Sequence, residues 1–66
     1  MQIRDFTRSE ADLLQAVCNF TKEENTLFEL RLSDIPLEEC AERMNISVPT
    51  AKRISQRVNA KISREI

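Results

Sequence analysis

The amino-acid sequence predicts a small all-α domain of four helices. Apolar residues recur at intervals of three and four along most of the chain, which is the spacing of an amphipathic helix. Two such stretches lie within residues 38–58, on either side of a short break at Asn45, Ile46 and Ser47. Two amphipathic segments joined by so short a break indicate a helix-turn-helix.

The length of the chain limits it to one compact unit. The sequence has 66 residues, which suits a single domain, residues 1–66, that buries roughly 60% of its unfolded surface. It begins with Met1 and shows neither an apolar run as long as a membrane span nor the opening of a signal peptide. We therefore expect a cytoplasmic protein with no membrane partner.

The composition argues against an enzyme. Histidine and glycine are both absent, so the commonest general base and the glycine-rich phosphate loops are missing. Cys18 and Cys40 fall on expected apolar helix faces without metal-ligand spacing, which favours reduced thiols in the core. The adjacent acids at 23–24 and 38–39 would permit acid–base chemistry, but acids near helix starts are more often surface residues. We expect no cofactor and no metal.

Capping boxes predict the starts of the first two helices. Thr7 and Glu10 are three residues apart, as are Thr21 and Glu24, so that each pair can satisfy two free amides at a helix N-terminus. The predicted helices are residues 8–18, with Leu13, Leu14, Val17 and Cys18 in the core, and residues 22–32, with Leu27, Phe28, Leu30 and Leu32 in the core.

Two further helices are predicted on either side of the break. Asn45 tolerates the left-handed conformation that ends a helix, and Ser47 is a suitable N-cap for the next one. Pro49 fits because its missing amide falls in the first turn, where no intrahelical partner exists. The predicted helices are residues 36–44, with the apolar stripe Leu37, Cys40, Ala41 and Met44, and residues 48–63, with the stripe Ala51, Ile54, Val58 and Ile62.

Charge is distributed unevenly along the chain. Residues 1–44 carry five basic and ten acidic side chains, whereas residues 45–66 carry five basic side chains and one acid, Glu65. Many surface helices end in lysine and arginine, which complement the helix dipole. The alternative that these basic residues only stabilise the end of the last helix therefore stays open. The basic end nevertheless marks the surface that would meet phosphate.

Residue types on the polar side of the last helix suit a DNA major groove. Arginine and lysine can reach guanine acceptors, and glutamine can pair with adenine. Hydroxyls and free amides at the helix start suit a phosphate oxygen. The predicted DNA-binding residues are Ser47, Thr50, Lys52, Arg53, Gln56 and Arg57, with Lys61 and Arg64 expected to contact only phosphates.

The run from Phe20 to Ile62 resembles the helix-turn-helix domains of LuxR-type regulators and region 4 of bacterial sigma factors. The resemblance rests on Phe20-Thr21, Leu27 to Leu30, Glu39-Cys40-Ala41, and Ile46-Ser47 through Thr50-Ala51-Lys52. The chain departs from those families at Pro36, Cys40 and Asn45, all of which keep geometry or apolarity. The resemblance implies a bacterial or prophage protein in which Thr50, Lys52, Arg53 and Gln56 face DNA.

Two functions are expected from these features. The first is a stand-alone, sequence-specific transcriptional regulator that binds double-stranded DNA, with a homodimer through Ile3, Phe6 and Leu14 as one arrangement. The alternative is a protein-interaction module that docks on RNA polymerase or a sigma factor through its acidic half.

Overall fold

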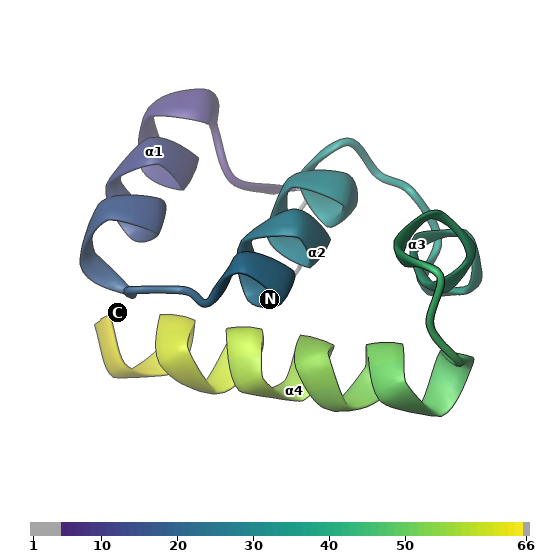
Figure 1. Ribbon diagram of the computed structural model, residues 1–66. Coiled ribbons are helices and arrows are strands. Elements are labelled where there is room, and N and C mark those ends of the chain that lie inside the picture. The colour runs from purple at the N-terminus through teal and green to yellow at the C-terminus, as the bar shows by residue number, and fades with distance from the viewer. Residues whose placement is uncertain (1–4, 66) are drawn as a thin grey trace.

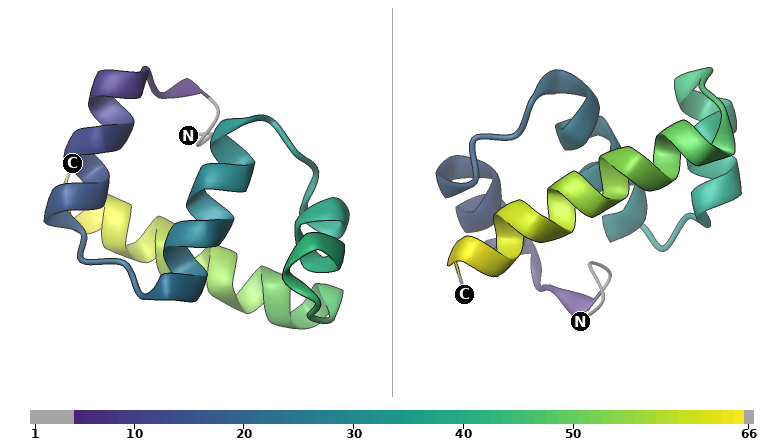
Figure 2. Two further views of the ribbon diagram at one scale, coloured as in Figure 1. Left: turned by 45° about the horizontal axis from the view of Figure 1, so that its top comes forward. Right: turned by 90° about the horizontal axis from the view of Figure 1, so that it is seen from below.

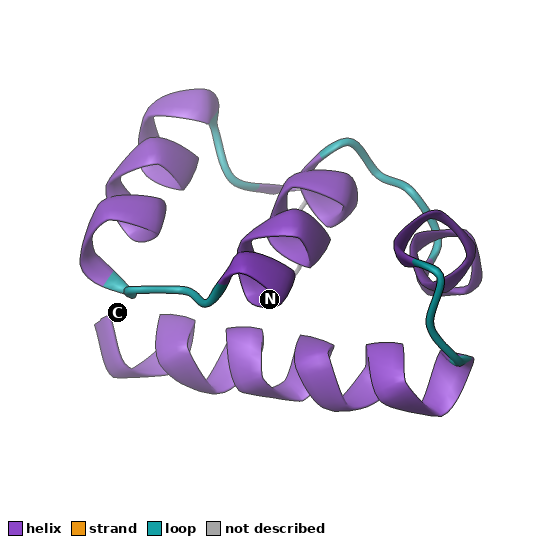
Figure 3. Cartoon of the chain, viewed as in Figure 1, coloured by secondary structure: helices purple, strands orange, loops and turns teal. Residues whose placement is uncertain are grey.

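Four α-helices account for most of the chain in the computed structural model, which describes residues 5–65. Figure 3 shows helices and loops only, so the predicted all-α class is confirmed for the described residues. The helices are α1 (Arg8–Val17), α2 (Lys22–Leu32), α3 (Leu37–Met44) and α4 (Val48–Glu65) (Figure 1). Three predicted ends differ slightly, because Cys18 and Pro36 act as caps and the last helix continues beyond residue 63.

The first three helices lie side by side along one face of α4 (Figures 1 and 2). With a rise of 1.5 Å per residue, the 18 residues of α4 extend about 27 Å, close to the longest dimension of the molecule, 28 Å. The N-terminal end of α4 lies below α3 and its C-terminal end lies below α1 (Figure 1). The opposite face of α4 is left without a covering helix.

Both predicted capping boxes are present. The Thr7 hydroxyl accepts a hydrogen bond from the Glu10 amide at 3.2 Å, and the Glu10 carboxylate accepts one from the Thr7 amide at 2.8 Å. Thr21 and Glu24 make the same pair of bonds at 3.3 and 3.0 Å. Local chemistry therefore fixes the first residue of α1 and of α2.

The break between α3 and α4 is the predicted tight turn. Asn45 adopts the left-handed conformation (φ 58°, ψ 45°), and the Ile46 amide donates to the Ala41 carbonyl at 3.0 Å. Ser47 then caps α4, because its hydroxyl accepts a hydrogen bond from the Thr50 amide at 3.3 Å. The predicted helix-turn-helix is thus formed by α3, residues 45–47 and α4.

The core lies between α4 and the other three helices. Its largest fully buried side chains are Phe28, Leu27, Ile62, Val58 and Cys40. The rings of Phe20 and Phe28 pack at a centroid distance of 5.2 Å. The predicted stripe of α4, Ala51, Ile54, Val58 and Ile62, is entirely buried.

The predicted core face of α1 was partly wrong. Leu14 and Cys18 are buried together with Ala11, whereas Leu13 is 63% exposed and Val17 is 46% exposed. A helix of ten residues at the edge of the layer buries only a narrow stripe, and Leu13 lies about 100° around the helix from Leu14. In α2, Leu30 and Leu32 are only partly buried, at the edge of the core. Of the helices within residues 5–65, none combines the length and the apolarity needed to cross a bilayer.

The structure also bears on the dimer contact expected from the sequence. Leu14 is buried in the core, so it has no surface to offer another chain. Phe6 is partly buried and packs against the same core, and Ile3 lies outside the described residues. The expectation of Leu14 as a dimer contact was therefore wrong.

Candidate nucleic-acid interface

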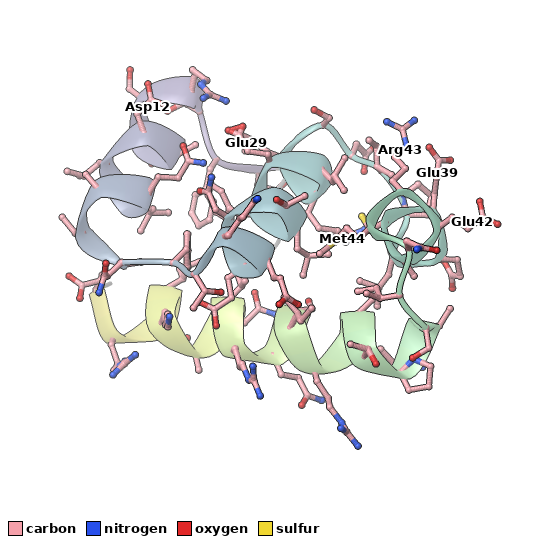
Figure 4. All side chains as sticks on the ribbon, viewed as in Figure 1. Asp12, Glu29, Glu39, Glu42, Arg43 and Met44 are labelled. Carbon is pink, nitrogen blue, oxygen red and sulfur yellow. The ribbon has the colours of Figure 1, made fainter. Side chains whose placement is uncertain are left out.

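The uncovered side of α4 carries a group of exposed basic and amide side chains, which we call the basic face. Because Ala51, Ile54, Val58 and Ile62 turn toward the core, the residues between them turn outward. Nitrogen-tipped side chains extend from α4 away from the other helices (Figure 4). The exposed members of the basic face are Lys52, Arg53, Gln56, Arg57 and Arg64.

The cations of the basic face form no salt bridge with an acid of residues 5–65, although the charge of Arg57 contributes to lowering the pKa of Glu24. Among residues 5–65, salt bridges join Arg8 to Asp12 and Glu29, Arg43 to Glu39, and Lys61 to Glu24. Lys52, Arg53, Arg57 and Arg64 take part in none of these bridges. Their positive charges are therefore available to an external anion.

Two hydroxyls mark the N-terminal end of the basic face. The Ser47 and Thr50 hydroxyl oxygens are 2.8 Å apart and share a hydrogen bond, and Thr50 is half-buried. The bond between them uses one of the two hydroxyl hydrogens and leaves the other to donate to an external acceptor, and Ser47 is exposed. That these two residues contact DNA stays a prediction.

Lys61 lies away from the basic face and faces α2. Its ammonium nitrogen is 2.5 Å from a carboxylate oxygen of Glu24 and 3.3 Å from the Asn19 carbonyl oxygen. Glu24 is buried, with 3% of its surface exposed. The sequence analysis expected Lys61 to contact a phosphate, whereas in the structure its ammonium group pairs with Glu24. We therefore leave Lys61 out of the basic face and retain Arg64.

The Glu24–Lys61 pair was missed by the sequence interpretation, which assigned Glu24 to a cap and, with Glu23, to the surface; the surface assignment of Glu24 was wrong, because its side chain is buried. A signal was present, because Glu24 precedes the buried Leu27 and Phe28 at intervals of three and four residues. That spacing places the Glu24 carboxylate on the core side of α2. A buried carboxylate needs a cationic or hydrogen-bonding partner, which Lys61 supplies from α4.

The buried pair predicts a loss of stability in acid. Burial alone raises the pKa of Glu24, but the hydrogen bonds from Lys61 and the Thr21 amide, together with the positive charges of Lys61 and Arg57, outweigh it, so the net pKa lies below its usual value. A lowered folded-state pKa stabilises the fold above the unfolded-state pKa, and this stability is lost as pH falls through the folded-state value. We expect the free energy of unfolding, measured with urea, to decrease below about pH 4.5.

Glu24→Gln is the matched control for this pH dependence. The amide keeps an acceptor oxygen for the Thr21 amide but cannot titrate. The variant should therefore lose less stability between neutral and acidic pH than the parent does. An equal loss in both proteins would contradict the assignment of this acid sensitivity to Glu24.

Acidic side chains lie on the other side of the molecule. Glu39 and Arg43 of α3 pair at 2.7 Å, and these two residues and Glu42 project away from the outer face of α4 (Figure 4). Asp12 and Glu29 lie on the α1 and α2 side of the molecule, also away from that face (Figure 4). The domain therefore has a basic face on α4 and an acidic side formed by the other helices.

Neither cysteine offers a reactive thiol. Cys18 and Cys40 are both unpaired and buried, as predicted, and burial raises the pKa of each thiol. The part of the chain that the structure describes contains no cluster of three or more cysteine, aspartate or glutamate side chains placed to hold a metal ion.

Comparison with known proteins gives no match to a family model, a curated protein or a solved structure. The functional assignment therefore depends on the residues themselves. The most distinctive surface they form is the basic face, where five exposed basic or amide side chains gather and form no salt bridge within the described part of the chain.

Proposed function

We propose that this chain is a sequence-specific transcriptional regulator that binds double-stranded DNA with the basic face in the major groove. One observation carries the proposal. Within residues 5–65, α4 carries on one exposed side a glutamine and four cations that form no salt bridge, and no other described helix covers that side. An α-helix fits the width of the major groove, and cations on its outer side attract phosphate.

Each member of the basic face has a chemical role in this proposal. Lys52 and Arg53 reach guanine acceptors and Gln56 pairs with adenine, since these are the side chains that recognise those base edges. Arg57 reads a base or contacts a phosphate, and Arg64 is far enough along α4 to contact only the DNA backbone. The resemblance of residues 20–62 to LuxR-type and sigma region 4 domains supports the same orientation. This activity would place the protein with DNA in the cytoplasm.

A second candidate is a module that docks on RNA polymerase or a sigma factor. The observation that favours it is the separate acidic side, because Glu39, Glu42 and Asp12 project away from the basic face and stay accessible when that face is occupied. Such a surface suits a basic partner. The two functions are compatible, since they use opposite sides of one domain.

Selection on random-sequence duplexes tests the proposal without knowledge of the target. We expect purified protein at physiological salt to enrich a motif, and affinity for that motif to fall with salt at a slope of about −2 to −4 in log K against log salt. This slope corresponds to the release of counterions by two to four cations of the basic face. Failure to enrich any motif would contradict the DNA-binding proposal and favour the docking function.

A further inference from the structure

The outer side of α4 has a middle line and two flanks. At about 100° per residue, the four buried residues of this helix define the inward direction, and the opposite direction is the middle of the outer side. The exposed Arg53, Gln56 and Ala60 lie within about 40° of that middle, and we call these three residues the reading line. Pro49 continues the same line into the first turn of the helix.

Cations lie on both flanks of the reading line. By the same rotation, Lys52 lies about 65° to one side of the middle and Arg57 lies about 75° to the other side. Both side chains are exposed, and neither forms a salt bridge within residues 5–65. Because a phosphate backbone borders each side of a major groove, this distribution suits a helix whose reading line is turned to the bases.

The outer side of α4 suits contact along its length and not at its N-terminal end alone. The only acid within Val48–Glu65 is Glu65, at the very end of the helix. Lys52 and Arg64 are twelve residues apart in the chain, which separates them by about 18 Å along the helix axis. No other described helix covers this side (Figures 1 and 2). Cations near both ends of the outer side therefore favour a helix that lies along the groove.

Ala60 is the member of the reading line that the sequence analysis did not use. It follows Gln56 by four residues, so it lies about one turn further along the same side of the helix. Its side chain is exposed, and it lies outside the core. A methyl group forms no hydrogen bond, so Ala60 can match only an apolar group on a base edge. In the major groove that group is the 5-methyl group of thymine.

The length of the reading line sets where this thymine lies. Arg53 and Ala60 are seven residues apart, or about 10.5 Å along the helix, and Gln56 and Ala60 are about 6 Å apart. Successive base pairs are about 3.4 Å apart along the DNA axis. Since a helix that follows the groove is inclined to that axis, these lengths correspond to at most about three and two base-pair steps.

We propose that Ala60 recognises the 5-methyl group of a thymine within about two base pairs of the adenine that Gln56 reads, an inference that rests on the proposed DNA binding. Along the helix, Arg53, Gln56 and Ala60 then read guanine, adenine and thymine in that order. The recognised feature is the methyl group of a pyrimidine, and unmodified cytosine lacks it. The selected motif should therefore exclude cytosine at this position.

Replacement of thymine by uracil tests the inference, because it removes only the 5-methyl group. Each thymine of the motif selected by the full chain is replaced singly by deoxyuridine, and affinity is measured by fluorescence anisotropy. Gln56→Ala should relax the preference for adenine at one position, which locates the adenine that Gln56 reads. We expect a loss of roughly threefold to tenfold for one thymine within about two base pairs of that adenine.

Ala60→Gly assigns the contact to its side chain. The variant lacks the methyl group, so the ratio of its affinities for the thymine and uracil duplexes should fall below about twofold. Both duplexes are measured with the same protein, so any change in the folded fraction cancels in this ratio. Asn59→Ala is the matched control, because Asn59 is exposed on α4 but lies about 85° from the middle of the outer side. It should keep the full uracil effect.

Three results would overturn the inference while the DNA-binding proposal stands. They are a motif without thymine within about two base pairs of that adenine, unchanged affinity for every uracil duplex, and an equal uracil effect in the parent and in Ala60→Gly. The last result would assign the methyl contact to another side chain, such as that of Thr50. If no motif is enriched at all, the proposed function fails, and the inference fails with it.

Discussion

Arg53→Glu combined with Gln56→Ala is expected to weaken binding to the selected DNA motif by at least about 100-fold without changing the melting temperature. Each lost base contact is worth about 1–3 kcal/mol, and the new carboxylate adds repulsion from phosphate. Stability should not change, because both side chains are exposed and neither bonds to another residue of the described chain. Fluorescence anisotropy with the motif and thermal unfolding by circular dichroism measure the two quantities.

Arg43→Glu is the matched control for charge. It changes the net charge as much as Arg53→Glu does, but Arg43 pairs with Glu39 on the side of α3 that points away from the basic face. We expect at most a severalfold loss of affinity from this variant, through long-range electrostatics alone. Parent-like binding by the double variant would show that the basic face is misassigned, and an equal loss in Arg43→Glu would show that overall charge, not base reading, determines affinity.

Glu24→Ala is expected to cost about 2–4 kcal/mol of folding free energy, a large part of the stability of so small a domain. The substitution leaves the Lys61 ammonium without its carboxylate and removes the acceptor for the Thr21 amide. The expected cost is below that of a fully buried pair because Lys61 retains 22% side-chain exposure and can regain some water. Urea unfolding monitored by circular dichroism measures the change.

Two further variants separate the buried pair from a general effect of helix charge. Glu23→Ala removes the neighbouring, exposed acid from the first turn of α2 and should cost less than about 1 kcal/mol. Glu24→Met with Lys61→Met removes both charges together, and should be more stable than Glu24→Ala because no unpaired charge remains. If Glu24→Ala were as stable as Glu23→Ala, the pair would have no structural role.

Local chemistry explains which parts of the fold could be predicted. The caps at Thr7, Thr21 and Ser47 and the left-handed Asn45 depend on neighbours within a few residues, so the sequence predicts them. The exposure of the basic face was predictable for the same reason, because the regular apolar stripe of α4 assigns the remaining positions to solvent.

The features that were not predicted depend on residues far apart in the chain. Glu24 and Lys61 are separated by 37 positions, so no local pattern pairs them. In α1, Leu13 and Leu14 are equally apolar neighbours, and only the positions of α2 and α4 decide which of them is buried. The pairing of Lys61 was missed for a similar reason. The charge of Lys61 is evident from the sequence, but its partner Glu24 is known only from the fold.

The place of α4 beneath the other three helices also sets the order of events during synthesis. Translation makes α1, α2 and α3 before the side chains of α4 that close their core, Val58 and Ile62 among them. Contacts such as that of the Cys18 thiol with the Lys61 carbonyl, at 3.7 Å, join distant parts of the chain and cannot form earlier. A nascent chain without α4 has neither a closed core nor a basic face, so both depend on the synthesis of the same helix.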